Sequence, residues 1–313
     1  MDDIIANALL DSAILAPSGH NSQPWKFRVG EDCITVMPDF SKRLYMVDPL
    51  DREIFISIGC AVENICITAT KFNLKALVEI KDNNVDIAFE RCTDIVASPL
   101  VSFIAKRQTN RNIFDNTLIH KSIIDHLSST GAKLYSRGSK EFDIVKSFVK
   151  LGNSAQMTDK DFVNELKEWM RLNETQAARE LDGLSYDVIG APNMPSWISR
   201  PIVSLMLNAA MQNRSDMKKL QSSPFIAAFD GQDDMAGWIE TGRRLERFLL
   251  IATSHNIACA FINQPCEVES LAVELGRQLH LQQKLQILLR IGHASPSKRS
   301  RRRPREAFIV DDM

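Results

Sequence analysis

Apolar positions along the chain follow two periods, and this pattern predicts both helices and strands. Before Pro17 the apolar residues keep helical spacing, and proline ends that run because it offers no amide donor to a helix. Two runs at 25–29 and 33–37 then alternate apolar with polar residues, and Gly30-Glu31-Asp32 joins them. Alternation with a period of two is typical of half-buried strands, so a β-hairpin is predicted here.

A long apolar stripe predicts the first core helix. Its members lie three or four residues apart and therefore share one helical face: Ile54, Ile58, Val62, Ile65, Ala69 and Phe72. Asp51 is the predicted N-cap of this helix. Two strands are predicted to follow, at 76–80 and 85–90, joined by the polar turn Asp82-Asn83-Asn84.

The unit of helix and strand recurs later in the chain. Residues 59–74 align without a gap to residues 242–257, and Gly, Glu, Ala, Thr and Asn coincide at five places. Both copies continue into an apolar strand, at 76–80 and at 258–262. Two unrelated amphipathic helices would match in part by chance, but the matching strands favour a duplicated half-domain.

Between residues 151 and 223 the helical pattern is long but interrupted. An apolar series that includes Phe162 keeps helical spacing, 183–197 is irregular, and 201–211 is strongly apolar. Two interpretations stay open: a cover over a ligand pocket, and additional helical packing around the core. Regular elements are predicted again afterwards, namely a strand at 225–229, a helix at 238–254 and a last strand at 286–292.

Composition narrows the class of protein. A chain of 313 residues has room for one large domain or two ordinary ones, and 38 basic residues nearly balance 39 acidic ones. The near-zero net charge argues against a nucleic-acid binder. The N-terminus lacks a secretory pattern, and no apolar run is expected to reach the length of a membrane span. A cytoplasmic protein with neither a nucleic acid nor a membrane as partner is therefore expected.

Cysteine and histidine spacing predicts no metal site. The six cysteines include no CxxC pair, and several lie in apolar runs, so free buried thiols are expected. His120 and His126 are six residues apart, which does not place them on one face of a helix.

The polar turn after the first helix is the first candidate site. Ser18, Asn21 and Gln23 supply hydroxyl and amide groups between two prolines, a composition that an ordinary loop shares. The string Ala-Pro-Ser-x-x-Asn-x-Gln-Pro-Trp-x-Phe at 16–27 resembles a hallmark of nitroreductase-like flavoproteins, in which this turn borders the flavin ring of FMN. The resemblance implies that these three residues contact the cofactor. His20 occupies a variable place in the pattern and is expected to be solvated.

The second block of the resemblance is Lys106-Arg107-Gln108-Thr109-Asn110-Arg111, followed by Asn112-Ile113-Phe114. It is similar to the Arg-Arg-Ser-x-Arg-x-Phe start of family members. Guanidinium groups bind a phosphate dianion through paired, charge-assisted hydrogen bonds. Arg107 and Arg111, with the hydroxyl of Thr109, are therefore the expected ligands of the FMN phosphate, although a solvated basic loop would have the same composition.

The third block, Asn263-Gln264-Pro265-Cys266-Glu267-Val268, matches a loop of the single-chain family members. In the family this loop passes beside the flavin ring, where a main-chain donor stabilises negative charge on the reduced ring. The resemblance therefore makes Asn263 and Gln264 cofactor candidates, whereas Cys266 is expected to pack.

The fourth block is the basic run at 298–305, which follows the last predicted strand. Such a run is also typical of a nucleic-acid or localisation signal. Family members end with a similar strand and an Arg-Arg-Pro element whose arginine meets the FMN phosphate. Alignment on Pro304 favours Arg302 as that ligand, followed by Arg301 and Arg303.

Together these blocks imply an α+β, nitroreductase-like fold built as a pseudo-dimer within one chain. The predicted halves are 1–98 and 99–313, each with a central antiparallel sheet and core helices, and 151–223 is an inserted helical cover. One FMN would lie in the seam, bound by different groups from each half. No Gly-x-Gly-x-x-Gly follows a strand, which argues against a Rossmann dinucleotide domain. A monomer and a homodimer both stay open.

The implied activity is that of an FMN-dependent oxidoreductase. It would accept hydride from NAD(P)H and pass it to a nitroaromatic, a quinone or a similar small acceptor, with no side chain acting as a general acid. A flavin-sequestering protein with little or no turnover is the alternative. A dehydrogenase acting on a peptide or a metabolite is a third option.

Overall fold

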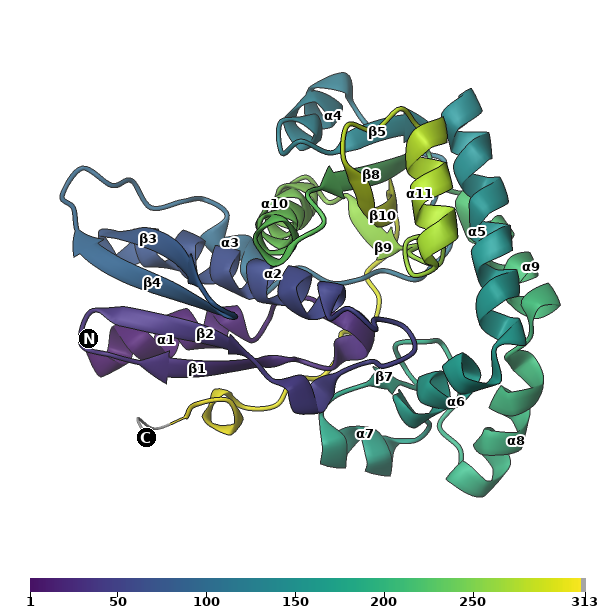
Figure 1. Cartoon of the computed structure of the whole chain (residues 1–313), viewed down its shortest axis with the longest axis horizontal. Helices are drawn as coiled ribbons and strands as arrows, with labels where there is room; N and C mark the ends of the chain where they lie inside the picture. The colour runs from purple at the N-terminus through teal and green to yellow at the C-terminus, as the bar shows by residue number, and fades with distance from the viewer. Residues whose placement is uncertain (311–313) are drawn as a thin grey trace.

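Two four-stranded antiparallel sheets form the framework of the protein (Figure 1). The computed structural model describes residues 1–310. In spatial order, the first sheet contains β1 (Trp25–Val29), β2 (Cys33–Pro38), β4 (Asn84–Arg91) and β3 (Leu74–Lys81). The second contains β5 (Lys133–Ser136), β8 (Phe225–Gly231), β10 (Lys284–Gly292) and β9 (Ala258–Phe261). Helices combined with antiparallel sheets confirm the predicted α+β class.

Helices precede, connect and cover these strands. Those of the framework are α1 (Asp3–Ala13), α2 (Arg52–Ala69), α3 (Val101–Ile104), α4 (Lys121–Ser128), α10 (Met235–Ser254) and α11 (Glu269–Gln278). The intervening region contains α5 (Lys140–Thr158), α6 (Lys160–Glu168), α7 (Glu174–Glu180), α8 (Ser196–Met206) and α9 (Ala209–Gln221), with the short strand pair β6 (Met170–Arg171) and β7 (Leu184–Ser185).

The two sheets share one topology. In each, the strands lie in the order first, second, fourth, third along the chain. In each, a long helix connects the second strand to the third: α2 in the first sheet and α10 in the second. Two copies of one ancestral unit would have this arrangement, and the duplication itself stays a prediction.

The helices α2 and α10 pack against each other at two glycines. A Cβ atom on Gly59 would lie 2.0 Å from the carbonyl oxygen of Ile239, and one on Gly242 would lie 2.0 Å from that of Ile56. Such contacts are far inside van der Waals separation, so only glycine permits this crossing. Gly59 and Gly242 are also the first matched pair of the internal repeat, which explains why glycine stands in both copies.

The core helix α2 corrects the expectation that no apolar run reaches the length of a membrane span. Residues 52–72 are long and apolar enough by composition to span a membrane, with a mean hydropathy of 1.4. However, 89% of that window is buried inside the protein, where α1, α10 and the first sheet surround it. A helix that is apolar all round is buried on all sides, and here the protein itself covers it.

The start of α2 corrects a second expectation, namely that Asp51 is the N-cap of the helix. Asp51 precedes the helix with a left-handed φ of 60° and makes no capping hydrogen bond. Its carboxylate instead binds Arg43, with Nε to Oδ1 at 2.7 Å. Asp48 caps the helix, because its Oδ2 accepts from the amides of Glu53 at 2.8 Å and Ile54 at 3.3 Å.

The region 151–223 packs on the core in one part and borders a cavity in another, and its role as a cover stays a prediction. Leu220 of α9 packs with α5 residues such as Phe148 in a core cluster that covers the second sheet. By contrast, Phe162 and Leu166 of α6 and Leu184 of β7 line a cavity. In Figure 1, α6 and α7 extend away from the second sheet toward the N-terminal half, whereas α8 lies at the lower right margin.

The C-terminal segment returns to the first sheet. After β10 the chain runs back along β1, where the Phe27 amide donates to the Phe308 carbonyl at 2.8 Å and the Val310 amide to the Phe27 carbonyl at 2.9 Å (Figure 1). The Phe308 ring packs on Trp25 and Phe27. Residues near 308 therefore pack with the first half, although the predicted division at residue 98 assigns them to the second.

Candidate functional site

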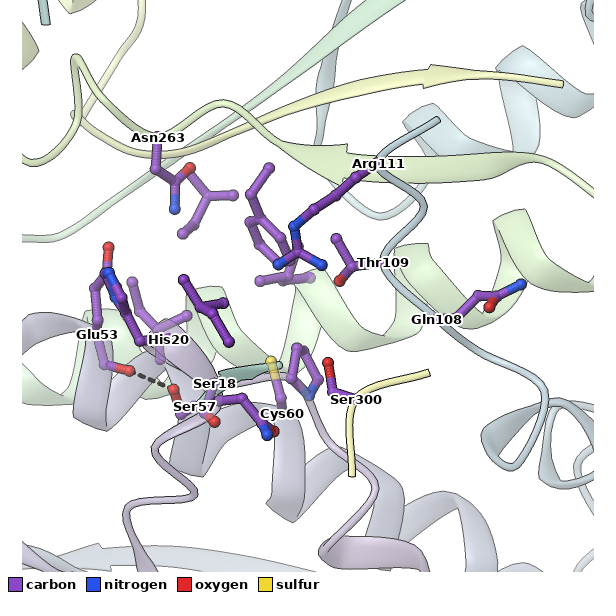
Figure 2. Close-up of a pocket in the computed structure, with 18 of the residues that line it drawn as sticks. Ser18, His20, Glu53, Ser57, Cys60, Gln108, Thr109, Arg111, Asn263 and Ser300 are labelled. Carbon is purple, nitrogen blue, oxygen red and sulfur yellow. Dashed lines mark hydrogen bonds between the residues drawn. The ribbon is translucent and has the colours of Figure 1, made fainter. Parts of the chain in front are cut away.

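A cavity of about 300 Å³ lies where the two halves and the intervening region meet. It brings together the turn after α1, the N-terminal part of α2, the segment 104–111 and the loop 263–267. Figure 2 shows Arg111 and Thr109 from one side and Ser57 and Cys60 of α2 from another around the same space. Of the predicted residues, these border it: Ser18, Asn21, Arg107, Thr109, Arg111, Asn263, Gln264 and Arg302.

The turn after α1 keeps its shape through its own polar side chains. His20, Asn21 and Gln23 all have left-handed φ values, between 48° and 58°, which non-glycine residues adopt rarely. Ser18 Oγ accepts from the Gln23 amide at 3.0 Å, and Asn21 Oδ1 accepts from Arg302 Nη1 at 2.5 Å. These bonds hold the backbone in that conformation at the edge of the cavity.

Gln23 does not border the cavity. Its side chain is fully buried, donates to the Leu181 carbonyl at 2.9 Å and accepts from the Arg303 amide at 3.0 Å. These bonds tie the turn to the intervening region and to the C-terminal segment. Gln23 therefore supports the site through the backbone around it.

His20 differs from the expectation of a solvated side chain. It is half-buried on the cavity wall. Burial, together with repulsion from Arg111, lowers the pKa of His20 to about 4, so the imidazole is neutral at physiological pH.

Arg111 is half-buried, and it lacks a counter-ion among residues 1–310. Its Nη1 has no hydrogen-bond partner there, and burial lowers the pKa of its guanidinium. Arg107, on the same segment, has partners: its Nη2 donates to the Leu15 carbonyl at 2.7 Å and its Nε lies 3.4 Å from Glu246 Oε1. A buried charge without a partner is costly, so Arg111 identifies the part of the cavity suited to an anion.

Among the C-terminal arginines, Arg302 is the predicted phosphate ligand that reaches the cavity. Arg302 borders the cavity and donates to the carbonyls of Ile14 at 2.9 Å and Ala16 at 3.0 Å. Its burial and the neighbouring Arg107 lower the pKa of Arg302 to about 9.

Arg301 and Arg303 lie outside the cavity lining. Arg301 binds Glu174 at 2.6 Å, and Arg303 lies over the Phe308 ring, 4.7 Å from its centroid. Arg299, which the sequence analysis did not single out, borders the cavity and donates to the carbonyls of Ala105 and Lys106. The basic run was the only sequence signal for Arg299, and spacing from Pro304 did not identify it.

The loop at 263–264 presents amide groups to the cavity. Asn263 Oδ1 accepts from the Leu288 amide at 3.0 Å, which fixes the loop to β10. Gln264 Nε2 donates to Asp216 at 3.0 Å, while its Oε1 is buried without a partner within the described chain. Helix α5 approaches this loop closely at Gly152, where a Cβ would lie 2.7 Å from the Gln264 carbonyl carbon.

The sequence analysis did not identify three carboxyl groups that lie near Arg52 in the interior of the protein. Asp48 and Glu53 flank the start of α2, and Glu267 lies on the opposite loop, where it accepts from Gln156 Nε2 at 2.5 Å. Burial is the main cause that raises the pKa of each carboxyl group to about 7, and repulsion among them adds to it. Asp48 and Glu53 are five residues apart, but Glu267 is more than 200 residues away, so no spacing rule connects the three.

These carboxyl groups make stability depend on pH. Their pKa values are raised in the folded state, so the neutral acids favour folding, and this contribution is lost as pH rises from about 4 to 7. We expect the free energy of unfolding of the apoprotein to decrease across this window, and Glu53→Gln to reduce the decrease by about 1–3 kcal/mol. Urea denaturation at pH 5, 6, 7 and 8 measures this. Glu31→Gln, at an exposed position, is the control, and an equal slope in both variants would contradict the expectation.

Among residues 1–310, no three His, Cys, Asp or Glu side chains gather in a way that could hold a metal ion. All six cysteines are free, and Cys60, Cys259 and Cys266 are buried. Burial raises the pKa of the Cys60 thiol, which lies on the cavity wall with its Sγ 3.1 Å from the Gly242 carbonyl oxygen.

No protein-family model matches the chain. Two curated proteins of Mycobacterium tuberculosis, from strains CDC 1551 and H37Rv, are each 26% identical to it over 281 residues, which cover 83% of this chain and 76% of theirs. Both carry the name "Putative NAD(P)H nitroreductase". They confirm the nitroreductase resemblance of the sequence, whereas the single-chain pseudo-dimeric branch stays a prediction.

Solved nitroreductases match part of the chain at low similarity. One is an FMN-bound nitroreductase from Bacteroides fragilis, 13% identical, with a TM-score of 0.37 over 63% of this chain and 89% of its own. Another is the FMN-dependent nitroreductase NfnB from Mycobacterium smegmatis in complex with NADPH, 11% identical, with a TM-score of 0.40 over 63% of this chain and 88% of its own.

Proposed function

We propose that this nitroreductase-like chain binds FMN in the cavity and is an NAD(P)H-dependent oxidoreductase. The observation that carries the proposal is Arg111, a half-buried arginine on the cavity wall whose buried Nη1 has no partner among the described residues. A phosphate dianion would supply that counter-ion through charge-assisted hydrogen bonds. The curated relatives named as NAD(P)H nitroreductases support the same conclusion.

The residues around the cavity suit the different parts of FMN. Arg111 and the Thr109 hydroxyl are the proposed ligands of the phosphate. Ser18 and the amides of Asn263 and Gln264 are the proposed partners of the polar edge of the flavin, and the unpaired Gln264 Oε1 supports this assignment. Arg107 and Arg302 donate to the protein itself, so they position the surrounding backbone and add positive charge.

We further propose that the cavity lies in the seam of a duplicated unit. The shared strand order of the two sheets and the reciprocal packing of Gly59 and Gly242 support this proposal. The turn at 18–21 comes from the first half, and Arg111 and Asn263 come from the second. In this arrangement one polypeptide supplies the groups that a homodimer would take from two chains.

Bound FMN would supply two-electron transfer between NAD(P)H and a nitroaromatic, a quinone or a similar small acceptor. The chain would bind the phosphate, orient the ring and limit access of water. Phe162, Leu166 and Leu184 give the wall formed by the intervening region an apolar surface that favours exclusion of water. His20, neutral because of its lowered pKa, adds no charge to that wall.

The visible spectrum of the purified protein tests the cofactor, and steady-state kinetics test the activity. We expect flavin absorption bands, release of FMN on heating, and oxidation of NADH or NADPH that depends on an added quinone or nitroaromatic compound. A colourless protein that does not take up added FMN would contradict the proposed cofactor.

Flavin storage is the second candidate function, and one observation favours it. The intervening region is joined to the turn beside the cavity by Gln23 to Leu181 at 2.9 Å and by the Gly183 amide to the Asn21 carbonyl at 3.3 Å, and it is joined to the C-terminal segment by Arg301 to Glu174. A cover held in this way would restrict entry of a reductant. A protein that carries FMN stoichiometrically but shows no turnover with either nicotinamide cofactor would favour storage over the oxidoreductase.

A further inference from the structure

Helix α8 exposes its apolar face. Trp197 is 76% exposed and Leu205 is 78% exposed, and Ile202 and Met206 are also exposed. The side that faces the protein carries the buried Ser199. Ile198 and Val203 are half-buried, so α8 carries apolar residues on its exposed side as well as on the side that faces the protein.

The chain around α8 is also free of negative charge. Residues 188–215 contain no aspartate or glutamate, and they include Arg200 and Arg214. Arg214 and Lys218 of α9 are exposed. Asp216, which interrupts this series, is buried and accepts from Asn153 at 3.0 Å, so its carboxylate is turned away from the surface.

A groove of about 550 Å³ lies beside α8, along Arg200, Val203 and Ser204. Its charged lining comes from α6 to α8 and carries more positive than negative side chains: Lys167, Arg171, Arg179 and Arg200 against Glu168 and Glu180. Arg171 pairs with Asp182 at 2.7 Å and Arg179 with Glu180 at 2.7 Å. Within residues 1–310, Lys167 and Arg200 form no ion pair, so both cations are available to an external anion.

We propose that α8 and the basic groove beside it form a docking surface for an anionic phospholipid bilayer. The apolar residues of α8 enter the boundary between headgroups and acyl chains, and Lys167, Arg200 and Arg214 lie near the lipid phosphates. Amphipathic helices with exposed aromatic and basic residues bind membranes in this manner, and each basic residue near the surface adds about 1 kcal/mol. This surface departs from the absence of a membrane partner expected from the sequence.

Charge favours a bilayer over a second copy of the chain. In a symmetric dimer each patch meets its own equivalent, so the excess positive charge of one patch would face the excess positive charge of the other. An anionic lipid surface complements both features, because it offers apolar depth and negative charge together. In Figure 1, α8 lies at the margin of the molecule, away from both sheets.

Vesicle binding tests the proposal with the full-length protein. We expect co-sedimentation with vesicles of phosphatidylcholine and phosphatidylglycerol (3:1), at least 10-fold weaker binding to phosphatidylcholine alone, and weakening by added salt. Ile202→Ser combined with Leu205→Ser should reduce binding at least 10-fold. Val273→Ser, at an exposed apolar position on α11, is the matched control and should bind as the parent does.

Tryptophan emission supplies a local readout. Trp197 should enter the lipid boundary, so vesicles should shift the emission to shorter wavelength, and Trp197→Phe should bind vesicles while losing the shift. Absence of binding to the anionic vesicles, or equal binding by the serine variant, would overturn the proposal. So would a dimer in light scattering that the serine variant abolishes, or binding of glycerol phosphate in the groove without any binding of vesicles.

Discussion

Gly59→Ala is expected to lower the free energy of unfolding by at least about 3 kcal/mol. The new Cβ would lie 2.0 Å from the Ile239 carbonyl oxygen and 3.0 Å from Gly242 Cα, and both are backbone atoms that cannot rotate away. The helices α2 and α10 would have to separate at the centre of the core. Urea denaturation followed by circular dichroism measures the loss.

The α11 helix offers a matched control. A Cβ on Gly276 would lie 3.8 Å from its nearest neighbours, an ordinary contact, so Gly276→Ala should be neutral or stabilise by about 0.5–1 kcal/mol. Gly242→Ala should resemble Gly59→Ala, and the double variant should cost less than the sum, because one separation of the helices relieves both contacts. A loss below 1 kcal/mol for Gly59→Ala would contradict the described packing.

Arg111→Ala is expected to weaken FMN binding about 10- to 150-fold, which corresponds to the 1.5–3 kcal/mol of a hydrogen bond to a charged group. The same substitution removes a half-buried cation whose buried Nη1 has no partner among residues 1–310, so the apoprotein should be at least as stable as the parent. Flavin fluorescence titration measures the dissociation constant, and thermal denaturation of the apoprotein measures its stability.

Substitutions of two other arginines distinguish a residue that binds FMN from one that supports the backbone around the cavity. Arg301→Ala should leave FMN affinity unchanged, because that side chain binds Glu174 outside the cavity lining. Arg302→Ala should lower both FMN affinity and apoprotein stability, because Arg302 holds the carbonyls of Ile14 and Ala16. Unchanged FMN affinity in Arg111→Ala would contradict the phosphate assignment.

Local patterns in the sequence predicted the framework well. The hairpin at 25–37 and the core helix α2 depend on alternation and helical spacing, which are properties of neighbouring residues. The N-cap of α2 was wrongly assigned to Asp51, because the sequence does not reveal that Arg43 engages its carboxylate and leaves the cap to Asp48.

The site was predicted in outline, and its details depend on contacts between distant segments. Sequence motifs brought the turn at 18–21 and Arg111 into one hypothesis, and both border one cavity. Gln23 looked equivalent to Asn21 in the motif, but its side chain bonds to Leu181 and Arg303, which no local pattern reveals. The neutral His20 and the carboxyl groups around Arg52 follow from burial in the assembled fold, so they too escaped sequence analysis.

The path of residues 299–310 constrains the order of events during synthesis. Arg302 and Arg303 hold the backbone of the turn after α1, and Phe308 packs on Phe27 of β1. Residues that are translated early can therefore form these contacts only when residues 302–308 have been synthesised. A nascent chain still inside the ribosomal tunnel would lack this brace. The pocket can therefore mature only after residues 299–310 have emerged from the tunnel, and any prosthetic group must be captured after that point.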